Sequence, residues 1–258
     1  MIALEHVSKS YDGSRSFAVR DVMLDIAQGT FVALIGDSGS GKTTLMKMIN
    51  RLVDPDAGSV RVGDRAVQDV PPHELRRQIG YVFQGIGLFP HLTVAENIGI
   101  TPRLLGWPEQ KVEARVHELA ELIGLPDSFL TRAPAELSGG QQQRVGVARA
   151  LAARPAVMLM DEPFGALDPV MRDTLGTEYR KLHEVMGLTT VMVTHDVLEA
   201  VLLSDRIVVM RQGEVVADGE PRELLREHDD PAIRNMMDMP LRQARRVRAL
   251  VEEQAPRG

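Results

Sequence analysis

The sequence predicts an α/β fold, in which a parallel sheet is joined by antiparallel strands near the N-terminus and interrupted by an inserted helical segment. Apolar runs at 31–36, 156–162 and 189–195 are typical of strands buried on both faces of a parallel sheet. The last two flank a helical stretch of crossover length. Strand patterns and glycine turns dominate the first 80 residues, whereas helical patterns dominate residues 93–154.

The first 80 residues contain four predicted strands. These are IALEHVSKSY, RDVMLDI, FVALIG and GSVRVGDRAV, at 2–11, 20–26, 31–36 and 58–67. The short stretches QG and DAG between them are typical of turns.

Helix signals follow from residue 93. Thr93 and Glu96 have the spacing of a capping box, and Pro108 suits the first position of a further helix. That helix has one apolar face and is expected to stop at Gly124. The face comprises Val112, Val116, Leu119, Ala120 and Ile123. Near the C-terminus, residues 205–219 are predicted to form a hairpin about Gln212-Gly213.

Composition excludes several classes of protein. The net charge of -6 and pI of about 5.7 argue against nucleic acid as a partner. With no cysteine, the 258-residue chain has no disulfide and no thiolate chemistry. No apolar run approaches the ~20 residues that cross a bilayer, and no leader pattern begins the sequence. We therefore expect a chain that neither spans a membrane nor is secreted.

A glycine-rich loop between a strand and a helix predicts a phosphate site. The spacing G-x-x-x-x-G-K-T leaves backbone N–H groups open to an anion, and the helix that follows points its positive end at the same place. Lys42 is expected to reach the β- and γ-phosphates, and Thr43 to bind Mg²⁺. The predicted phosphate-binding residues are Gly36, Asp37, Ser38, Gly39, Ser40, Gly41, Lys42, Thr43 and Thr44.

Further polar residues end the other two apolar strands. Asp161 fits an acid that holds Mg²⁺ through water, and Glu162 fits a carboxylate that orients an attacking water. A helix cap at the strand end is the alternative. His195 is placed to hydrogen-bond a γ-phosphate, and because ligands bind at the carboxyl ends of strands in such sheets, the three strand ends should share one crevice.

The stretch LSGGQQQR at 137–144 is a further candidate anion site. Ser138 is a good helix cap, and Gly139 and Gly140 expose N–H groups at a helix start. An ordinary capped helix explains this stretch equally well when it is taken alone.

Together these motifs resemble the ATP-hydrolysing subunits of ABC transporters, over about residues 2–225. The resemblance implies a P-loop NTPase (RecA-like) core that binds ATP and Mg²⁺. Tyr11 matches the aromatic that stacks on adenine, and Gln84 the glutamine that contacts Mg²⁺ and the attacking water. Asp168 matches a loop between subunits, with a turn cap as the alternative.

The resemblance also implies partners. ATP is expected between the phosphate loop of one subunit and Ser138, Gly139, Gly140 and Gln141 of another, either a second copy of the chain or a paralogue. Integral-membrane permease subunits, and indirectly a solute-binding protein, are expected at the cytoplasmic face of the cell membrane.

The same resemblance divides one domain, 1–258, into parts. Residues 1–86 and 156–220 would form the nucleotide-binding α/β core with its β subdomain. Residues 87–155 would form the helical subdomain, and 221–258 a C-terminal helical tail.

Within the family, residues 75–98 look like the ATPases of bacterial importers for osmoprotectants such as glycine betaine and choline. An apolar patch beside Gln84 suits a short helix of a permease, although packing of the helical insertion is the alternative. The patch is Ile86, Leu88, Phe89, Leu92 and Val94. Many such ATPases continue into regulatory modules, whereas this sequence stops at Gly258, so whether that regulation carries over stays open. The arginine-rich tail at 241–253 suits a solvated helix or one near anionic lipid.

Three other functions fit parts of the pattern. The chain could serve an importer of another small solute, or be a soluble ATPase that acts on a protein assembly or in DNA repair. The acidic balance and the apolar patch count against the soluble forms. A nucleotide switch without hydrolysis is disfavoured by Glu162 and His195.

Overall fold

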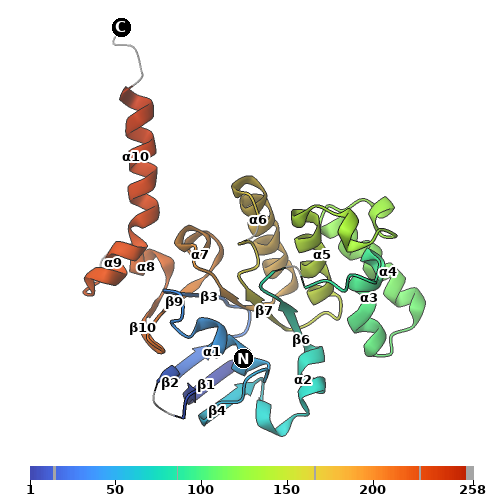
Figure 1. The fold of residues 1–258 in the computed structure, drawn as a ribbon, viewed down its shortest axis with the longest axis horizontal. Coiled ribbons are helices and arrows are strands. Elements are labelled where there is room, and N and C mark those ends of the chain that lie inside the picture. Colours follow the sequence, from blue (N-terminus) through green and yellow to red (C-terminus); the bar gives the residue numbers. More distant parts are fainter. Residues whose placement is uncertain (14–15, 86, 166, 227, 254–258) are drawn as a thin grey trace.

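The computed structural model describes residues 1–13, 16–85, 87–165, 167–226 and 228–253 (Figure 1). The strands are β1 (Ile2–Ser10), β2 (Phe17–Ile26), β3 (Phe31–Ile35), β4 (Ala57–Val62), β5 (Arg65–Ala66), β6 (Ile79–Val82), β7 (Val157–Asp161), β8 (Thr189–Val193), β9 (Arg206–Arg211) and β10 (Glu214–Gly219). The helices are α1 (Lys42–Ile49), α2 (Pro72–Gln78), α3 (Val94–Leu104), α4 (Glu109–Leu122), α5 (Gly139–Leu151), α6 (Pro169–Met186), α7 (Val197–Leu203), α8 (Pro221–Arg226), α9 (Pro231–Met237) and α10 (Met239–Glu253).

Two sheets form the body of the molecule, as predicted. One has the order β10-β9-β3-β8-β7-β6, in which β9, β3, β8, β7 and β6 are parallel to their neighbours and β10 is antiparallel to β9. The other is the antiparallel sheet β2-β1-β4-β5. The fold class expected from the sequence is therefore confirmed.

The three apolar runs form strands that are covered on both faces. Every residue of β3, β7 and β8 is buried. Along β3, Phe31, Ala33 and Ile35 belong to a core shared with α3, α4 and α5, whereas Val32 and Leu34 belong to a core shared with α1 and the antiparallel sheet. Since side chains alternate along a strand, a continuous apolar run fills both cores.

The inserted helices pack on one of these cores. Thr93 caps α3 in the predicted capping box with Glu96. The predicted face of α4 is buried, but Pro108 is the residue before the helix rather than its first residue. Its backbone is extended, and a proline there needs no N–H partner.

The sequence prediction missed three elements, α2, β6 and α7. The strand β6 has only four residues and is the edge strand next to β7, so it shows little periodicity. The predicted strand 58–67 is broken at Gly63-Asp64 into β4 and β5. The predicted division of the chain at 86, 155 and 220 stays a prediction.

The C-terminal part begins with the predicted hairpin, β9–β10, which turns at Gln212 and Gly213. Figure 1 shows α10 extending away from the body. Its arginines are exposed: Arg242, Arg245, Arg246 and Arg248. Within the ranges described above, none of the helices combines the length and the hydropathy that crossing a bilayer requires.

Candidate functional site

The predicted site lies at the carboxyl ends of three adjacent strands. Because β3, β8 and β7 are parallel neighbours, their last residues lie along one edge of the sheet. The structure brings polar groups from all three together, with Gln84 from the segment after β6. Thr43 Oγ1 donates to Asp161 Oδ1 at 3.0 Å, Gln84 Nε2 donates to Glu162 Oε2 at 3.1 Å, and His195 Nδ1 lies 3.4 Å from Glu162 Oε1.

The glycines of the loop between β3 and α1 have left-handed backbones. Gly36, Gly39 and Gly41 have φ of +140°, +77° and +102°. A Cβ on Gly36 would lie 2.1 Å from the carbonyl oxygen of Met210, and one on Gly41 would lie 2.1 Å from that of Ala18. Nothing lies within 4 Å of a Cβ on Gly39. Gly36 and Gly41 therefore let the backbones of β9 and β2 approach closely. Of the three glycines, only Gly39 has backbone that faces open space.

Lys42 is the first residue of α1, and its side chain contacts this loop. Its ammonium group donates to the carbonyl oxygens of Gly36 and Asp37 at 2.8 Å each, and to Ser40 Oγ at 3.3 Å. Burial lowers the pKa of Lys42, while the nearby charges of Glu162, Asp37 and Asp161 oppose this shift. A bound anion would compensate the buried positive charge, so the loop suits a phosphate chain.

Asp161 is a buried acid with a hydroxyl as its partner. Burial raises the pKa of Asp161, although the hydrogen bond from Thr43 and the charges of Lys47 and Lys42 lower it. A hydroxyl and one carboxylate beside a phosphate loop fit Mg²⁺, which keeps several waters and takes its other ligands from phosphates. The described residues contain no cluster of three or more His, Asp or Glu side chains that could hold a metal by themselves.

Glu162 lies between Gln84 and His195 in a strained backbone conformation. Its φ is +46°, and its N–H donates to the carbonyl of Val193 on β8 at 2.9 Å. In this left-handed conformation the side chain contacts Gln84 and His195. Gln84 and His195 hold the two carboxylate oxygens of Glu162, an arrangement suited to orienting a water.

Six other predicted residues lie outside these contacts. Ser138 caps α5 and forms a capping box with Gln141, with Gly139 and Gly140 as the first helical residues. Helix α5 packs in one core and α1 in the other, so the two helix N-termini lie on different faces of the sheet. Tyr11 is 66% exposed, with Lys9 Nζ at 5.7 Å from its ring centroid. Asp168 caps α6 by accepting from Val170 and Met171 N–H groups, which matches the capping alternative.

The predicted apolar patch is corrected in part. Val94 is fully buried and Leu88 packs against the core, so the packing alternative holds for both. Ile86 lies outside the described residues. Phe89 is 40% exposed and lines a groove of about 600 Å³ beside Gln84. Its other lining residues include the apolar Tyr81, Phe83, Ile100 and Leu104, from β6, the segment after it and α3, and three arginines, Arg76, Arg77 and Arg149.

Asn97 holds one wall of this groove, and the sequence analysis missed it. Its side chain accepts from the Phe89 N–H at 2.9 Å and donates to the carbonyls of Phe89, Leu92 and Thr93 at 3.1, 3.1 and 2.9 Å. An asparagine inside a helix that faces the apolar core is a signal that could have found it, because a buried amide needs several partners.

Replacing Asn97 by Leu is expected to lower the free energy of unfolding by about 3 kcal/mol, because the backbone groups of residues 89–93 lose their buried partners. Urea denaturation measures the change. The control is Thr101→Val on the same helix, which should stay within about 0.5 kcal/mol of the parent. Equal stability of the two variants would contradict the role given to Asn97.

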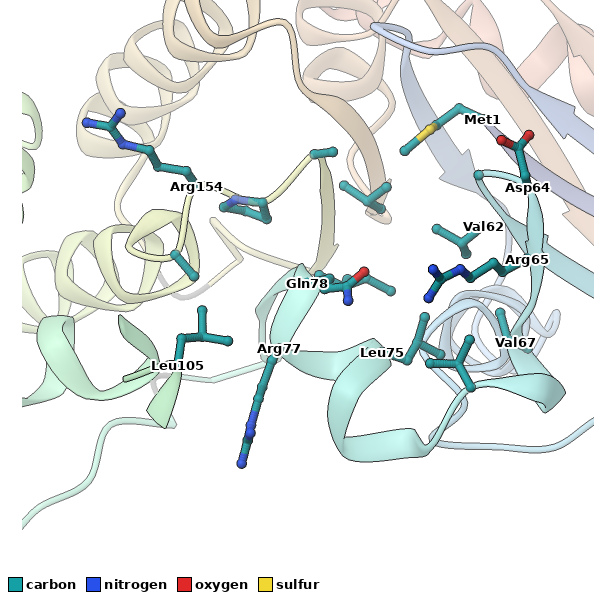
Figure 2. A pocket seen from close by; sticks show the side chains of 17 residues that line it. Met1, Val62, Asp64, Arg65, Val67, Leu75, Arg77, Gln78, Leu105 and Arg154 are labelled. Atoms are coloured by element: carbon teal, nitrogen blue, oxygen red, sulfur yellow. The ribbon is translucent and has the colours of Figure 1, made fainter. Parts of the chain in front are cut away.

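A second hollow, of about 430 Å³, lies at the opposite edge of the sheet, where β6 and β7 begin. Figure 2 shows Arg65 pointing into it toward Gln78, and Arg77 pointing away. The residues that line it include none of those predicted to bind phosphate or metal. This hollow is therefore separate from the predicted phosphate and metal site.

Comparisons with known proteins agree with this geometry. The profile of the family described as ABC transporter matches residues 19–165. The chain is 53% identical to the "Choline transport ATP-binding protein OpuBA" of Bacillus subtilis, over 89% of this chain and 60% of that protein. It is 51% identical to the "Glycine betaine uptake system ATP-binding protein YehX" of Escherichia coli, over 87% of this chain and 72% of that protein. The chain thus spans about three fifths of the length of the choline relative.

A solved structure is similar as well. It is the ATP-binding cassette MJ0796, a dimer in a post-hydrolysis state bound to ADP and Pi, with a TM-score of 0.78 and 35% identity. The match covers 85% of this chain and 98% of that one.

Proposed function

The chain belongs to the ABC transporter family, and we propose that it is the ATP-hydrolysing subunit of an importer for osmoprotectants such as glycine betaine or choline. The observation that carries the ATPase proposal is the contact of Glu162 with both Gln84 and His195 beside the Lys42 loop. The names of the two curated relatives support the substrate class.

In this proposal the groups of the site divide the work of hydrolysis. Lys42 and the loop N–H groups bind the phosphates of ATP and stabilise the charge that develops on them. Thr43, Asp161 and Gln84 would hold Mg²⁺, which when bound neutralises phosphate charge. Glu162 orients and polarises the attacking water, and His195 hydrogen-bonds the γ-phosphate while it fixes Glu162.

A second subunit would complete each site. The N-terminus of α5, with Ser138, Gly139, Gly140 and Gln141, offers N–H groups that lie on the other face of the sheet from α1. We place ATP between the Lys42 loop of one chain and this helix end of a second copy or paralogue, with Tyr11 against adenine and the Asp168 turn between the subunits. The dimeric state of MJ0796 supports this arrangement.

The groove beside Gln84 is the place we assign to a helix of the permease. It joins exposed apolar side chains to Gln84, which contacts Glu162, so a movement of a helix in the groove can reach the water-orienting carboxylate. The chain would act at the cytoplasmic face of the membrane, with a solute-binding protein as an indirect partner. The parts 1–86 with 156–220, 87–155 and 221–258 are the units that would move relative to one another.

Two measurements test the proposal in steps. The purified chain should hydrolyse Mg·ATP, and Lys42→Ala should remove that activity. When the chain is co-expressed with permease subunits of an osmoprotectant importer and reconstituted in liposomes with the binding protein, glycine betaine or choline should stimulate hydrolysis. A rate of ATP hydrolysis that neither solute changes would refute the proposed substrate class but not the proposed ATPase activity.

Phe89→Asp and Leu104→Asp are each expected to weaken co-purification with the permease about tenfold or more, since each replaces apolar surface that a docked helix would cover by a carboxylate that stays hydrated or pairs with the arginines of the groove. Affinity purification from detergent extracts measures the yield of the complex. Val185→Asp, at a residue of α6 that is 86% exposed, is the matched control and should leave the yield unchanged. Normal yield for both groove variants would move the docking site elsewhere.

A further inference from the structure

Glu199 is a buried carboxyl group that the proposed mechanism does not use. It lies in α7, four residues after His195, and is 9% exposed. Its Oε2 accepts a short hydrogen bond from the Thr194 hydroxyl. Its Oε1 is buried and has no hydrogen-bond partner among the described residues. Burying a carboxyl group with one oxygen unpaired costs free energy, and a functional role for the group would explain why it is kept.

Thr194 connects this carboxyl to the catalytic edge. Its N–H donates to the carbonyl of Leu34 at 3.2 Å, just before the phosphate loop. Its hydroxyl also accepts from the Asp196 N–H at 3.0 Å. The residue between Thr194 and Asp196 is His195, so the Thr194 hydroxyl bridges the turn from which the imidazole projects. Glu199 holds that hydroxyl in place.

A second set of contacts ties the same turn to α6. Asp196 caps α7 by accepting from the N–H groups of Leu198 and Glu199. Arg172 Nη1 lies 3.0 Å from the other oxygen of Asp196, and Arg172 Nη2 donates to the carbonyl of Leu167 at 3.2 Å. The His195 turn is therefore braced from α7 by Glu199 and from α6 by Arg172.

We propose that Glu199 is a positioning residue for His195, acting through the hydroxyl of Thr194 to hold the imidazole against Glu162. This role rests on the proposed ATPase function where it is tested by kinetics, whereas the test of the His195 position by NMR needs no hydrolysis. Loss of the Glu199–Thr194 contact frees the 194–196 turn, and His195 then spends less time within reach of Glu162 and a bound phosphate.

The positioning depends on pH because of what surrounds Glu199. Burial raises its pKa to about 7, with the charge of Asp196 acting in the same direction. The Thr194 hydrogen bond and the charges of Arg172 and His195 lower it. Glu199 also lines a hollow between α6 and α7, together with Asp173 and Arg180 of α6. Ionised Glu199 accepts a stronger, charge-assisted bond from Thr194 than protonated Glu199 does, so His195 is held better above pH ~7.

The kinetic test compares kcat and KM for ATP from pH 6 to 8. Thr194→Val is expected to lower kcat roughly tenfold with KM little changed, and Thr194→Ser, which keeps the hydroxyl, should recover most of it. The kcat ratio of parent to Glu199→Gln should rise from about one at pH 6 to about threefold or more at pH 8, because the amide cannot ionise. Asp173→Asn removes a charge from the same hollow and should give a ratio near one throughout.

A structural readout keeps the inference separate from the ATPase proposal. Nitrogen shifts of the His195 ring, assigned in NMR spectra with a His195→Gln variant, report how the imidazole is held without any hydrolysis. They should change in Thr194→Val and Glu199→Gln and stay as in the parent in Asp173→Asn. Unchanged His195 shifts, or a pH-independent ratio for Glu199→Gln, would overturn the inference. Absence of hydrolysis in the parent would instead refute the proposed function.

Discussion

Glu162→Gln is expected to lower the kcat for ATP about 100-fold or more, while ATP binding is kept. The amide has the size of the carboxyl but cannot carry the negative charge that polarises a water. The contacts to Gln84 and His195 reach both oxygens of the carboxylate, so the substitution changes the group that lies between them. Since closed subunits would then fail to hydrolyse the bound ATP, an ATP-bound dimer should accumulate.

Single-turnover kinetics and size-exclusion chromatography with ATP measure the two effects. Glu121→Gln, at an exposed glutamate near the end of α4, is the matched control and should behave as the parent does. Turnover of Glu162→Gln close to that of the parent would give the water-orienting role to another residue.

Gly41→Ala is expected to destabilise the fold by about 4 kcal/mol or more, independently of nucleotide. Gly41 has φ of +102°, and a Cβ there would lie 2.1 Å from the Ala18 carbonyl oxygen and 3.4 Å from the Met210 side chain. The backbone of β2 cannot move aside as the end of a flexible side chain can. The loop and the antiparallel sheet would therefore have to move apart.

Gly39→Ala is the matched control in the same loop. Its φ of +77° is also left-handed, but a Cβ would meet nothing within 4 Å, so a cost of about 1 kcal/mol is expected. Thermal and urea unfolding without nucleotide separate the two variants. Equal losses would mean that backbone conformation alone, and not the approach of Ala18, makes Gly41 necessary.

Much of the fold and of the candidate site could be predicted from local patterns. The runs around β3, β7 and β8 are buried on both faces because each alternate residue faces one of two cores. Their order in the sheet brings Lys42, Glu162 and His195 to one edge, as the strand-end argument required. The resemblance to ABC transporters agrees with the family match. The short strand β6 and the exact start of α4 could not be predicted, because a few residues show too little hydrophobic periodicity.

The amino-acid sequence by itself determined the two-faced strands, the phosphate-loop spacing and the capped start of α5, because each depends on residues close together in the chain. Only the tertiary structure decided why Gly36 and Gly41 must be glycine, since β9 and β2 approach them from distant parts of the chain. It also decided that Asn97 fixes the groove wall and that Glu199 reaches Thr194. Such groups acquire their roles from the neighbours that packing gives them, and spacing along the chain does not encode those neighbours.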